Sequence, residues 1–156
     1  ERHARAGIAV DAGFAFARPT NSVLLNTIEF IEAMKHYPIV FTGDAEPMPA
    51  ALVGLEKENI FIDAEGQWMA DAYIPAYARQ YPFIFFESAE EKKFYLCIDE
   101  AAPHFRAEGG EGMQPLFNGD KPAPLAEQAL QFCTAFYNHH AITKNFCADL
   151  KKHNLL

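Results

Sequence analysis

The chain has 156 residues, half of them apolar, and 21 acidic against 13 basic residues give it a formal net charge of −8. This acidic balance supplies no excess of positive charge for a phosphate backbone, which excludes the usual source of nucleic-acid affinity. No apolar run approaches the roughly 20 residues that a membrane-spanning helix needs. We therefore expect a globular protein with an aromatic-rich core, no nucleic-acid partner and no membrane span.

The number and spacing of the cysteines indicate whether the protein belongs in a reducing or an oxidising compartment. Cys97, Cys133 and Cys147 are odd in number and form no CxxC pair, so a disulfide framework is not expected and a reducing compartment such as the cytoplasm is slightly favoured. The chain begins at Glu1 without the charged and apolar regions of a signal peptide, which leaves export open.

The N-terminal third predicts strands followed by one helix. Residues 1–13 have no clear pattern and are expected to form an extended lead-in or an edge strand. Alternation at Phe14 and Phe16 predicts a first strand over 13–17, and residues 22–25 a second.

A capping box predicts the first helix. Asn26 can accept from free backbone donors while Glu29, three residues on, reaches back, and a helix over 27–36 follows. Its core-facing stripe is expected to contain Thr27, Ile31 and Met34, with Ile28 and Phe30 nearby.

The middle of the chain predicts a sheet. Apolar runs indicate strands over 39–41, 51–55, 60–62, 83–86 and 94–98, the fourth of them buried. Residues 60–62 should form a short hairpin with the segment around Trp68. Pro75 can open a single helical turn over 76–80, which Pro82 ends.

Residues 99–124 are rich in Pro and Gly and predict a long loop. Apolar residues at helical spacing then predict two helices, over 125–137 and 141–150, covering one sheet face. The expected fold is therefore α+β: a single domain over 1–156 with a mainly antiparallel or mixed sheet, one N-terminal helix and two C-terminal helices.

Eight segments in order carry a family resemblance: EF at 29–30, YPIVF at 37–41, ALVGL at 51–55, NIFID at 59–63, GQW at 66–68, YIPAYARQYPF at 73–83, CIDE at 97–100 and LF at 116–117. Together they resemble the SapC family of bacterial proteins. The resemblance implies association with bacterial surface layers through the family's name, and it supplies no catalytic residues. It also implies a longer chain, so that Glu1 marks a trimmed start.

One candidate site lies past the last predicted strand. Asp99, Glu100 and His104 place two carboxylates and an imidazole in a loop, where acid–base or metal-binding groups often occur. The structural alternative is favoured, in which Asp99 caps the turn entering 101–102. His139 and His140 are adjacent and cannot bind one ion from a single helix face, so a helix junction is expected there and no metal or cofactor.

A second candidate set combines aromatic rings with one guanidinium, which could stack on a sugar or grip a carboxylate: Trp68, Tyr73, Tyr77, Arg79 and Tyr81. The favoured alternative is core packing, with Arg79 paired to Asp63 or Asp99.

Two functions follow from these patterns. The first is a non-catalytic protein-interaction module, with a protein or surface-layer partner, because the sequence contains no catalytic spacing. The second is an enzyme or small-molecule-binding protein that uses Asp99, Glu100 and His104 with the aromatic set as its pocket wall. The sequence leaves the oligomeric state open.

Overall fold

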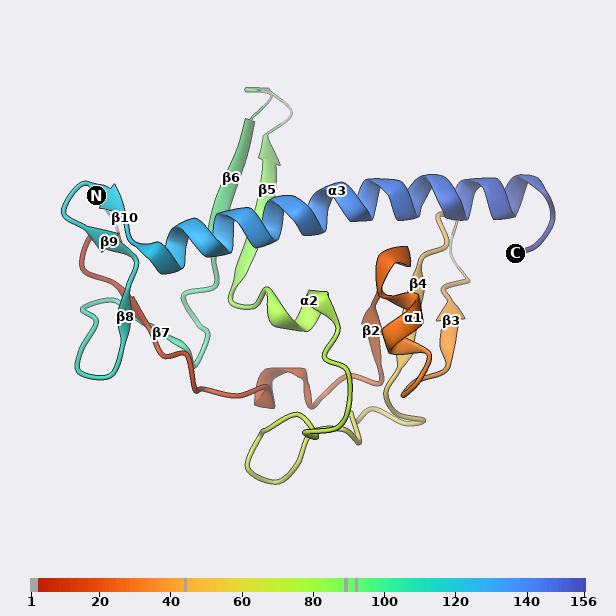
Figure 1. The fold of residues 1–156 in the computed structure, drawn as a ribbon, viewed down its shortest axis with the longest axis horizontal. Coiled ribbons are helices and arrows are strands. Elements are labelled where there is room, and N and C mark those ends of the chain that lie inside the picture. Colours follow the sequence, from red (N-terminus) through yellow and green to blue (C-terminus); the bar gives the residue numbers. More distant parts are fainter. Residues whose placement is uncertain (1–2, 44, 89, 92) are drawn as a thin grey trace. The chain divides into compact units, whose positions relative to one another are not determined.

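The computed structural model describes residues 3–43, 45–88, 90–91 and 93–156. The chain divides into two compact units, one formed by Phe14–Arg79 with Phe136–Leu156 and the other by Glu1–Gly13 with Gln80–Ala135. The described strands pair antiparallel in four small sheets, shown with the helices in Figure 1. The α+β class is confirmed, whereas the prediction of one continuous sheet is wrong. The single domain over 1–156 stays a prediction.

The first unit, Phe14–Arg79 with Phe136–Leu156, contains a three-stranded sheet in the order β2-β4-β3. Its strands are β2 (Ser22–Leu24), β3 (Ile39–Phe41) and β4 (Pro49–Leu52). The strands predicted over 22–25 and 39–41 are thereby confirmed, whereas the one predicted over 51–55 is confirmed only at Ala51 and Leu52. The strand predicted over 13–17 is wrong, because Ala15–Ala17 forms the 3-10 helix η1.

The first predicted helix is present but short. It consists of the 3-10 turn η2 (Thr27–Glu29) and the α-helix α1 (Phe30–Ala33), and it starts at the predicted capping box. The predicted core stripe is wrong for Ile31, Met34 and the neighbouring Ile28, which are exposed, whereas Phe30 does pack on the core. Glu29 and Ala33 are buried. A carboxylate thus takes the inward position that the pattern assigned to apolar side chains.

The segment that follows is held mainly by turns. Ile62 and Trp68 form an isolated antiparallel bridge around Gly66, so the predicted hairpin is reduced to one residue pair and no strand forms over 60–62. The predicted helical turn after Pro75 is confirmed as α2 (Ala76–Arg79). The core of this unit contains Val23, Leu25, Ala33, Tyr37, Ala51, Val53, Ile62, Trp68 and Ala78.

The second unit places the N-terminal segment at the centre of a sheet. β1 (Gly7–Ile8) pairs with β7 (Phe105–Arg106) on one side and β8 (Gln114–Pro115) on the other. The expectation of an edge strand is therefore wrong for Gly7–Ile8. The predicted loop over 99–124 also contains β9 (Phe117–Asn118), which pairs with β10 (Lys121–Pro122). Ala6, Ile8 and Leu116 form the core of this unit.

The same unit contains a longer hairpin, formed by β5 (Phe83–Ser88) and β6 (Lys93–Ile98). Its strands pair antiparallel, with Phe83 opposite Ile98. Figure 1 shows β5 and β6 side by side as one hairpin. The prediction that the first strand is buried is wrong, because Ile84 and Phe86 are exposed.

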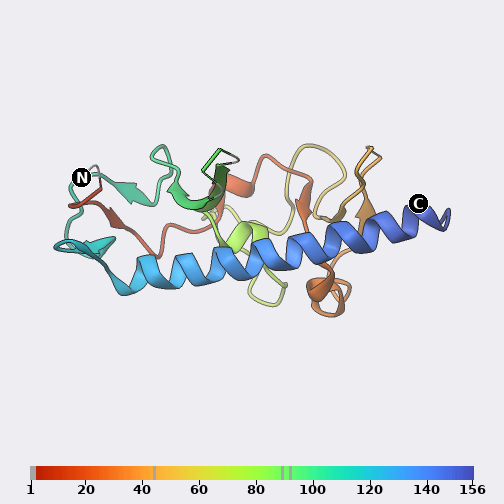
Figure 2. The same cartoon turned by 90° about the horizontal axis from the view of Figure 1, so that it is seen from above.

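The C-terminal part is one helix, α3 (Pro124–Lys152), of 29 residues, which runs without a break in Figure 2. The predicted pair of helices, with a junction at His139 and His140, is therefore wrong. Both imidazoles lie within the helix, and the ring of His140 stacks on that of Phe136 one turn earlier. Among the described residues, no helix combines the length and apolarity needed to cross a bilayer.

Candidate functional site

The predicted site residues divide between the two units. Trp68, Tyr73, Tyr77 and Arg79 belong to the unit that contains Phe14–Arg79, whereas Tyr81, Asp99, Glu100 and His104 belong to the other. Each group has its own set of hydrogen bonds.

In the first group, Tyr73 is bonded to the carboxylate of Glu29, which is only 4% exposed. One oxygen, Oε2, accepts from the backbone N–H of Asn26 at 2.8 Å. The other, Oε1, accepts from the backbone N–H of Ala76 at 2.7 Å and from the Tyr73 hydroxyl at 3.0 Å. A carboxylate is acceptor-only and can satisfy several donors at once. Glu29 therefore ties the start of η2 to the turn that begins α2.

A chain of aromatic hydrogen bonds runs beside this carboxylate. The buried indole N–H of Trp68 donates to the Tyr37 hydroxyl at 2.9 Å, and that hydroxyl donates to the Tyr73 carbonyl at 2.5 Å. Burial raises the pKa of the Tyr37 hydroxyl. Burial also raises the pKa of the Tyr73 hydroxyl, and the negative charge and hydrogen bond of the nearby Glu29 raise it further. Trp68 thus supports the turn from inside the core, in agreement with the packing alternative.

Arg79 is held against the same turn. Its Nε donates to the Ile74 carbonyl at 3.0 Å and its Nη2 to the Tyr73 hydroxyl at 3.2 Å, and the guanidinium carbon lies 5.7 Å from the centroid of the Tyr73 ring. Both of these acceptors are neutral oxygens, and the carboxylate partner predicted from Asp63 or Asp99 stays a prediction. Tyr77 is exposed, with its ring 6.1 Å from that of Phe136.

Helix α3 completes the cap of η2. The backbone N–H of Thr27 donates to Thr143 Oγ1 at 2.9 Å, and this fully buried hydroxyl donates to the His139 carbonyl at 2.8 Å. The Asn26 side-chain amide lies 3.5 Å from the Phe136 carbonyl. Sequence reasoning identified Asn26 and Glu29 as caps, but it missed Thr143, because the two partners are 116 residues apart.

In the second group, Tyr81 and Asp99 form a pair. The Tyr81 hydroxyl donates to Asp99 Oδ2 at 2.9 Å, and Oδ1 accepts from the backbone N–H of Ala101 at 2.9 Å. The second bond confirms the predicted turn cap. Burial, together with the hydrogen bond and negative charge of Asp99, raises the pKa of Tyr81 to about 12, so this phenol is protonated at neutral pH and acts as a donor.

The other two members of this group also have partners. His104 is buried, its Nε2 lies 3.1 Å from the Gly13 carbonyl, and its ring packs edge-on to Tyr81 at 5.4 Å. Glu100 Oε1 lies 2.7 Å from His3 Nε2. Among the described residues, no three His, Cys, Asp or Glu side chains are grouped to hold a metal ion.

Acid should weaken the fold through His104. Burial lowers the pKa of this imidazole, with the Gly13 bond opposing the shift. In the unfolded chain this histidine has an ordinary pKa near 6.5, so as the pH falls the unfolded state takes up a proton before the folded state does. The contribution of His104 to the free energy of unfolding is therefore fully present above about pH 6.5 and is lost as the pH falls toward the folded-state pKa. We expect a lower urea midpoint at pH 5.5 than at pH 7.5. The difference should shrink in His104→Gln.

The control for that experiment is His153→Gln, which changes an exposed histidine near the end of the chain. It should leave the pH dependence as in the parent. An equal pH dependence in parent and His104→Gln would contradict the assignment to His104.

The thiols behave as buried apolar groups. Cys133 and Cys147 are buried, Cys97 is half-buried, and all three are free. Burial raises the pKa of Cys133 to about 11 and also raises that of Cys147. Both thiols are therefore protonated at neutral pH and poor nucleophiles.

The hairpin β5–β6 presents a feature that the sequence did not reveal. Directly paired residues share a face, so Ile84 lies beside Cys97 and Phe86 beside Tyr95. Ile84, Phe86 and Tyr95 are 50%, 59% and 40% exposed. We call the four residues Ile84, Phe86, Tyr95 and Cys97 the hairpin face. It is an apolar surface open to contact.

Comparison with known proteins gives one positive result. No curated protein and no solved structure matches the chain. A family model described as SapC matches residues 1–156, which is the whole sequence. The resemblance carried by the eight segments is thereby confirmed, and the chain belongs to the SapC family.

Proposed function

We propose that this chain is a protein-interaction module that binds an extended segment of a partner protein along the hairpin β5–β6. The observation that supports this most directly is the exposure of Ile84, Phe86 and Tyr95 on one face of the hairpin. Exposed apolar residues that adjoin one another are typical of interaction sites, whereas scattered ones are ordinary.

The edges of the hairpin add a second argument. Among the described residues, no third strand pairs with β5 or β6. Each strand therefore lies at an edge of its sheet, and a sheet edge is where a strand of another protein can add. A two-stranded sheet is marginally stable alone, and an added strand would bury apolar area while it completes main-chain hydrogen bonds.

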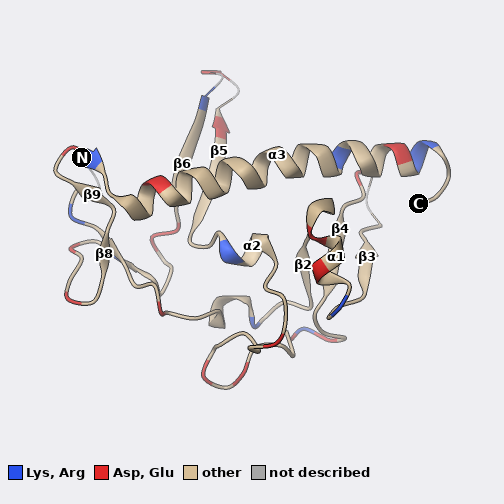
Figure 3. Ribbon diagram, viewed as in Figure 1, with Lys and Arg blue, Asp and Glu red and all other residues tan. Residues whose placement is uncertain are grey.

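The charged residues at the hairpin indicate which kind of partner segment would bind there. Glu87, Glu90 and Glu91 are exposed at the hairpin tip, with Lys93 as the described basic residue nearby. Figure 3 marks these acidic and basic positions on the ribbon. Lys93 Nζ lies 3.9 Å from Glu91, an exposed pair of small energetic value. A partner with alternating apolar residues and a lysine or arginine near the tip would match this surface. The family resemblance suggests a surface-layer protein as the partner class.

The alternative function, catalysis or small-molecule binding by Asp99, Glu100 and His104, has less support. Asp99 already accepts from Tyr81 and Ala101, and His104 Nε2 is engaged with Gly13. Glu100 contacts His3. A reacting group would have to displace these contacts.

A photocrosslinking experiment tests the proposed function. A benzophenone side chain is placed at position 86 or, as a control, at Ile31, an apolar residue of the other unit that is 72% exposed, against 59% for Phe86. After crosslinking in bacterial cells, the attached segment is identified by mass spectrometry and synthesised as a peptide. We expect specific crosslinking from position 86, and peptide binding to the parent chain.

The second part of the test introduces a negative charge into the hairpin face by substitution. Phe86→Asp should weaken peptide binding at least tenfold, because it places a carboxylate in the apolar contact, whereas Ile31→Asp should leave the affinity unchanged. Circular dichroism confirms that both variants fold. Equal crosslinking from both positions, or peptide binding that Phe86→Asp does not change, would overturn the proposal.

A further inference from the structure

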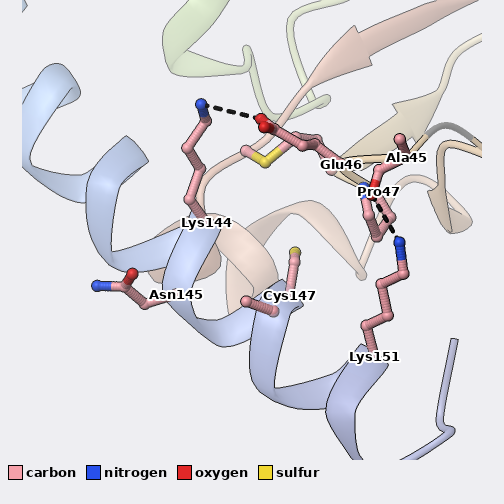
Figure 4. A pocket seen from close by; sticks show the side chains of 9 residues that line it. Ala45, Glu46, Pro47, Lys144, Asn145, Cys147 and Lys151 are labelled. Carbon is pink, nitrogen blue, oxygen red and sulfur yellow. Dashed lines mark hydrogen bonds and ion pairs between the residues drawn. The ribbon is translucent and has the colours of Figure 1, made fainter.

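A pocket of about 310 Å³ lies between the connection from β3 to β4 and helix α3, within one unit. Figure 4 shows it from close by, with residues from both segments facing one another. Ala45, Glu46, Pro47 and Met48 line one side, and Lys144, Asn145, Cys147, Ala148 and Lys151 line the other. Ligand pockets are typically roughly 300–1,000 Å³, so this volume suits a small ligand.

Two lysines line this pocket. Lys144 and Lys151 are seven residues apart on α3, which places them on the same side of the helix. Lys144 Nζ lies 3.3 Å from Glu46 Oε2, and Lys151 Nζ donates to the Ala45 carbonyl at 2.7 Å. The described lining thus contains two ammonium groups and one carboxylate, so it carries an excess of positive charge in a chain whose net charge is −8.

The rest of the lining is mostly apolar. Met48 and Cys147 are buried, and Pro47 and Ala148 lie beside them. Cys147 contributes a neutral thiol, which acts as a small apolar group. A ligand here would meet cationic groups and a polarisable apolar wall together.

We propose that this pocket binds a carboxylate attached to a short apolar chain. The carboxylate takes the place of Glu46 at Lys144, with the positive charge of Lys151 further along the same side of α3, and the apolar chain packs on Met48 and Cys147. The Lys144–Glu46 pair is solvent-exposed, and exposed ion pairs contribute little, so exchanging one carboxylate for another costs little. Two sources have this chemistry: a free alkanoate, or the C-terminus of a peptide that ends in an apolar residue.

Methionine methyl groups provide a local readout. The chain has four methionines, and Met48 lines the pocket while Met34, Met69 and Met113 do not. With ¹³C-labelled methyl groups, Met48→Leu assigns the Met48 signal, and the other three act as internal controls. Octanoate is titrated as the first probe. The second is an acetylated tetrapeptide with two C-terminal leucines, as the free acid and as the amide. Octanamide is the neutral counterpart of octanoate.

We expect a saturable shift of the Met48 signal with octanoate, the free-acid peptide or both, and much weaker shifts with octanamide and the peptide amide. A response to only one of the acids identifies the source. No saturable Met48 shift with either acid up to 10 mM would overturn the proposal. Equal binding of acid and amide would also overturn it, because the lysines would then have no role in recognition.

Substitutions distinguish a ligand-binding role of the two lysines from a purely structural role in holding the 45–46 segment. Lys144→Met should weaken binding about tenfold, whereas Lys152→Met, on the same helix but outside the lining, should not change it. Glu46→Gln should tighten binding about two- to fivefold, because it removes the competing carboxylate. If the lysines serve only to hold the 45–46 segment, Glu46→Gln should weaken or abolish any Met48 shift, and the proposal fails.

Discussion

Replacing Glu29 with Ala is expected to lower the free energy of unfolding by about 3–5 kcal/mol. The change removes the acceptor for three donors: the backbone N–H groups of Asn26 and Ala76 and the hydroxyl of Tyr73. Each buried group left unpaired costs about 1–3 kcal/mol, less whatever water recovers. Glu29→Gln should be intermediate, because its amide oxygen can still accept while its NH₂ group faces donors. Urea denaturation measures the effect.

Glu32→Ala is the matched control. This carboxylate, three residues further on, is exposed and pairs with Lys35 on the surface, so its loss should cost less than about 1 kcal/mol. Equal effects of Glu29→Ala and Glu32→Ala would show that the buried carboxylate does not organise this unit.

The second large effect is expected at Trp68. Trp68→Ala should cost about 3–5 kcal/mol, because it leaves a cavity in the core that contains Val53 and Ile62. Trp68→Phe should cost about 1–2 kcal/mol, since it mainly removes the N–H that donates to Tyr37. Denaturant midpoints provide the measurement.

Met69→Ala, at the exposed neighbouring position, should change stability by about 0.5 kcal/mol or less. If Trp68→Ala kept the parent stability and instead lost binding to a ligand or partner, the packing interpretation would be wrong. Trp68 would then belong to a binding surface.

Local signals predicted local structure well. The capping box at Asn26 and the proline before α2 each specify a conformation through groups a few residues apart, and both elements form there. Adjacent strands joined by short connections were also recognised, as β3–β4 and β5–β6 show. In these cases the required interactions lie within one stretch of chain.

The sequence predictions were wrong where the local structure depends on residues that are far away in the chain. Ile31 and Met34 of the predicted stripe face outward, because Glu29 faces inward to accept hydrogen bonds from Tyr73 and Ala76, which lie more than 40 residues away. Hydrophobic periodicity counts a glutamate as a surface residue and cannot anticipate this orientation. The two-residue strand β1 is likewise too short to be recognised from its own sequence, and it forms because β7 and β8 flank it.

The candidate site was predicted in part. Trp68, Tyr73 and Arg79 do gather around one turn, where Tyr73 joins them: its hydroxyl accepts from Arg79, and its carbonyl accepts from the Tyr37 hydroxyl to which Trp68 donates. The Tyr73 hydroxyl also donates to Glu29, a residue identified from sequence only as a helix cap. The hairpin face was missed because a run such as Phe83–Phe86 has the composition of a buried strand. Whether such a strand is covered depends on neighbours that its own residues do not specify.

The bond between Thr27 and Thr143 has a consequence for the order of biosynthesis. The ribosome makes residues 14–79 well before it reaches residue 143, so the start of η2 is translated long before its hydroxyl acceptor exists. Contacts between segments so far apart are slow to form because the chain must close a long loop first. During translation this unit therefore exposes an incomplete helix start and apolar surface later covered by α3, and a nascent chain stalled before residue 143 should be a substrate for chaperones and proteases.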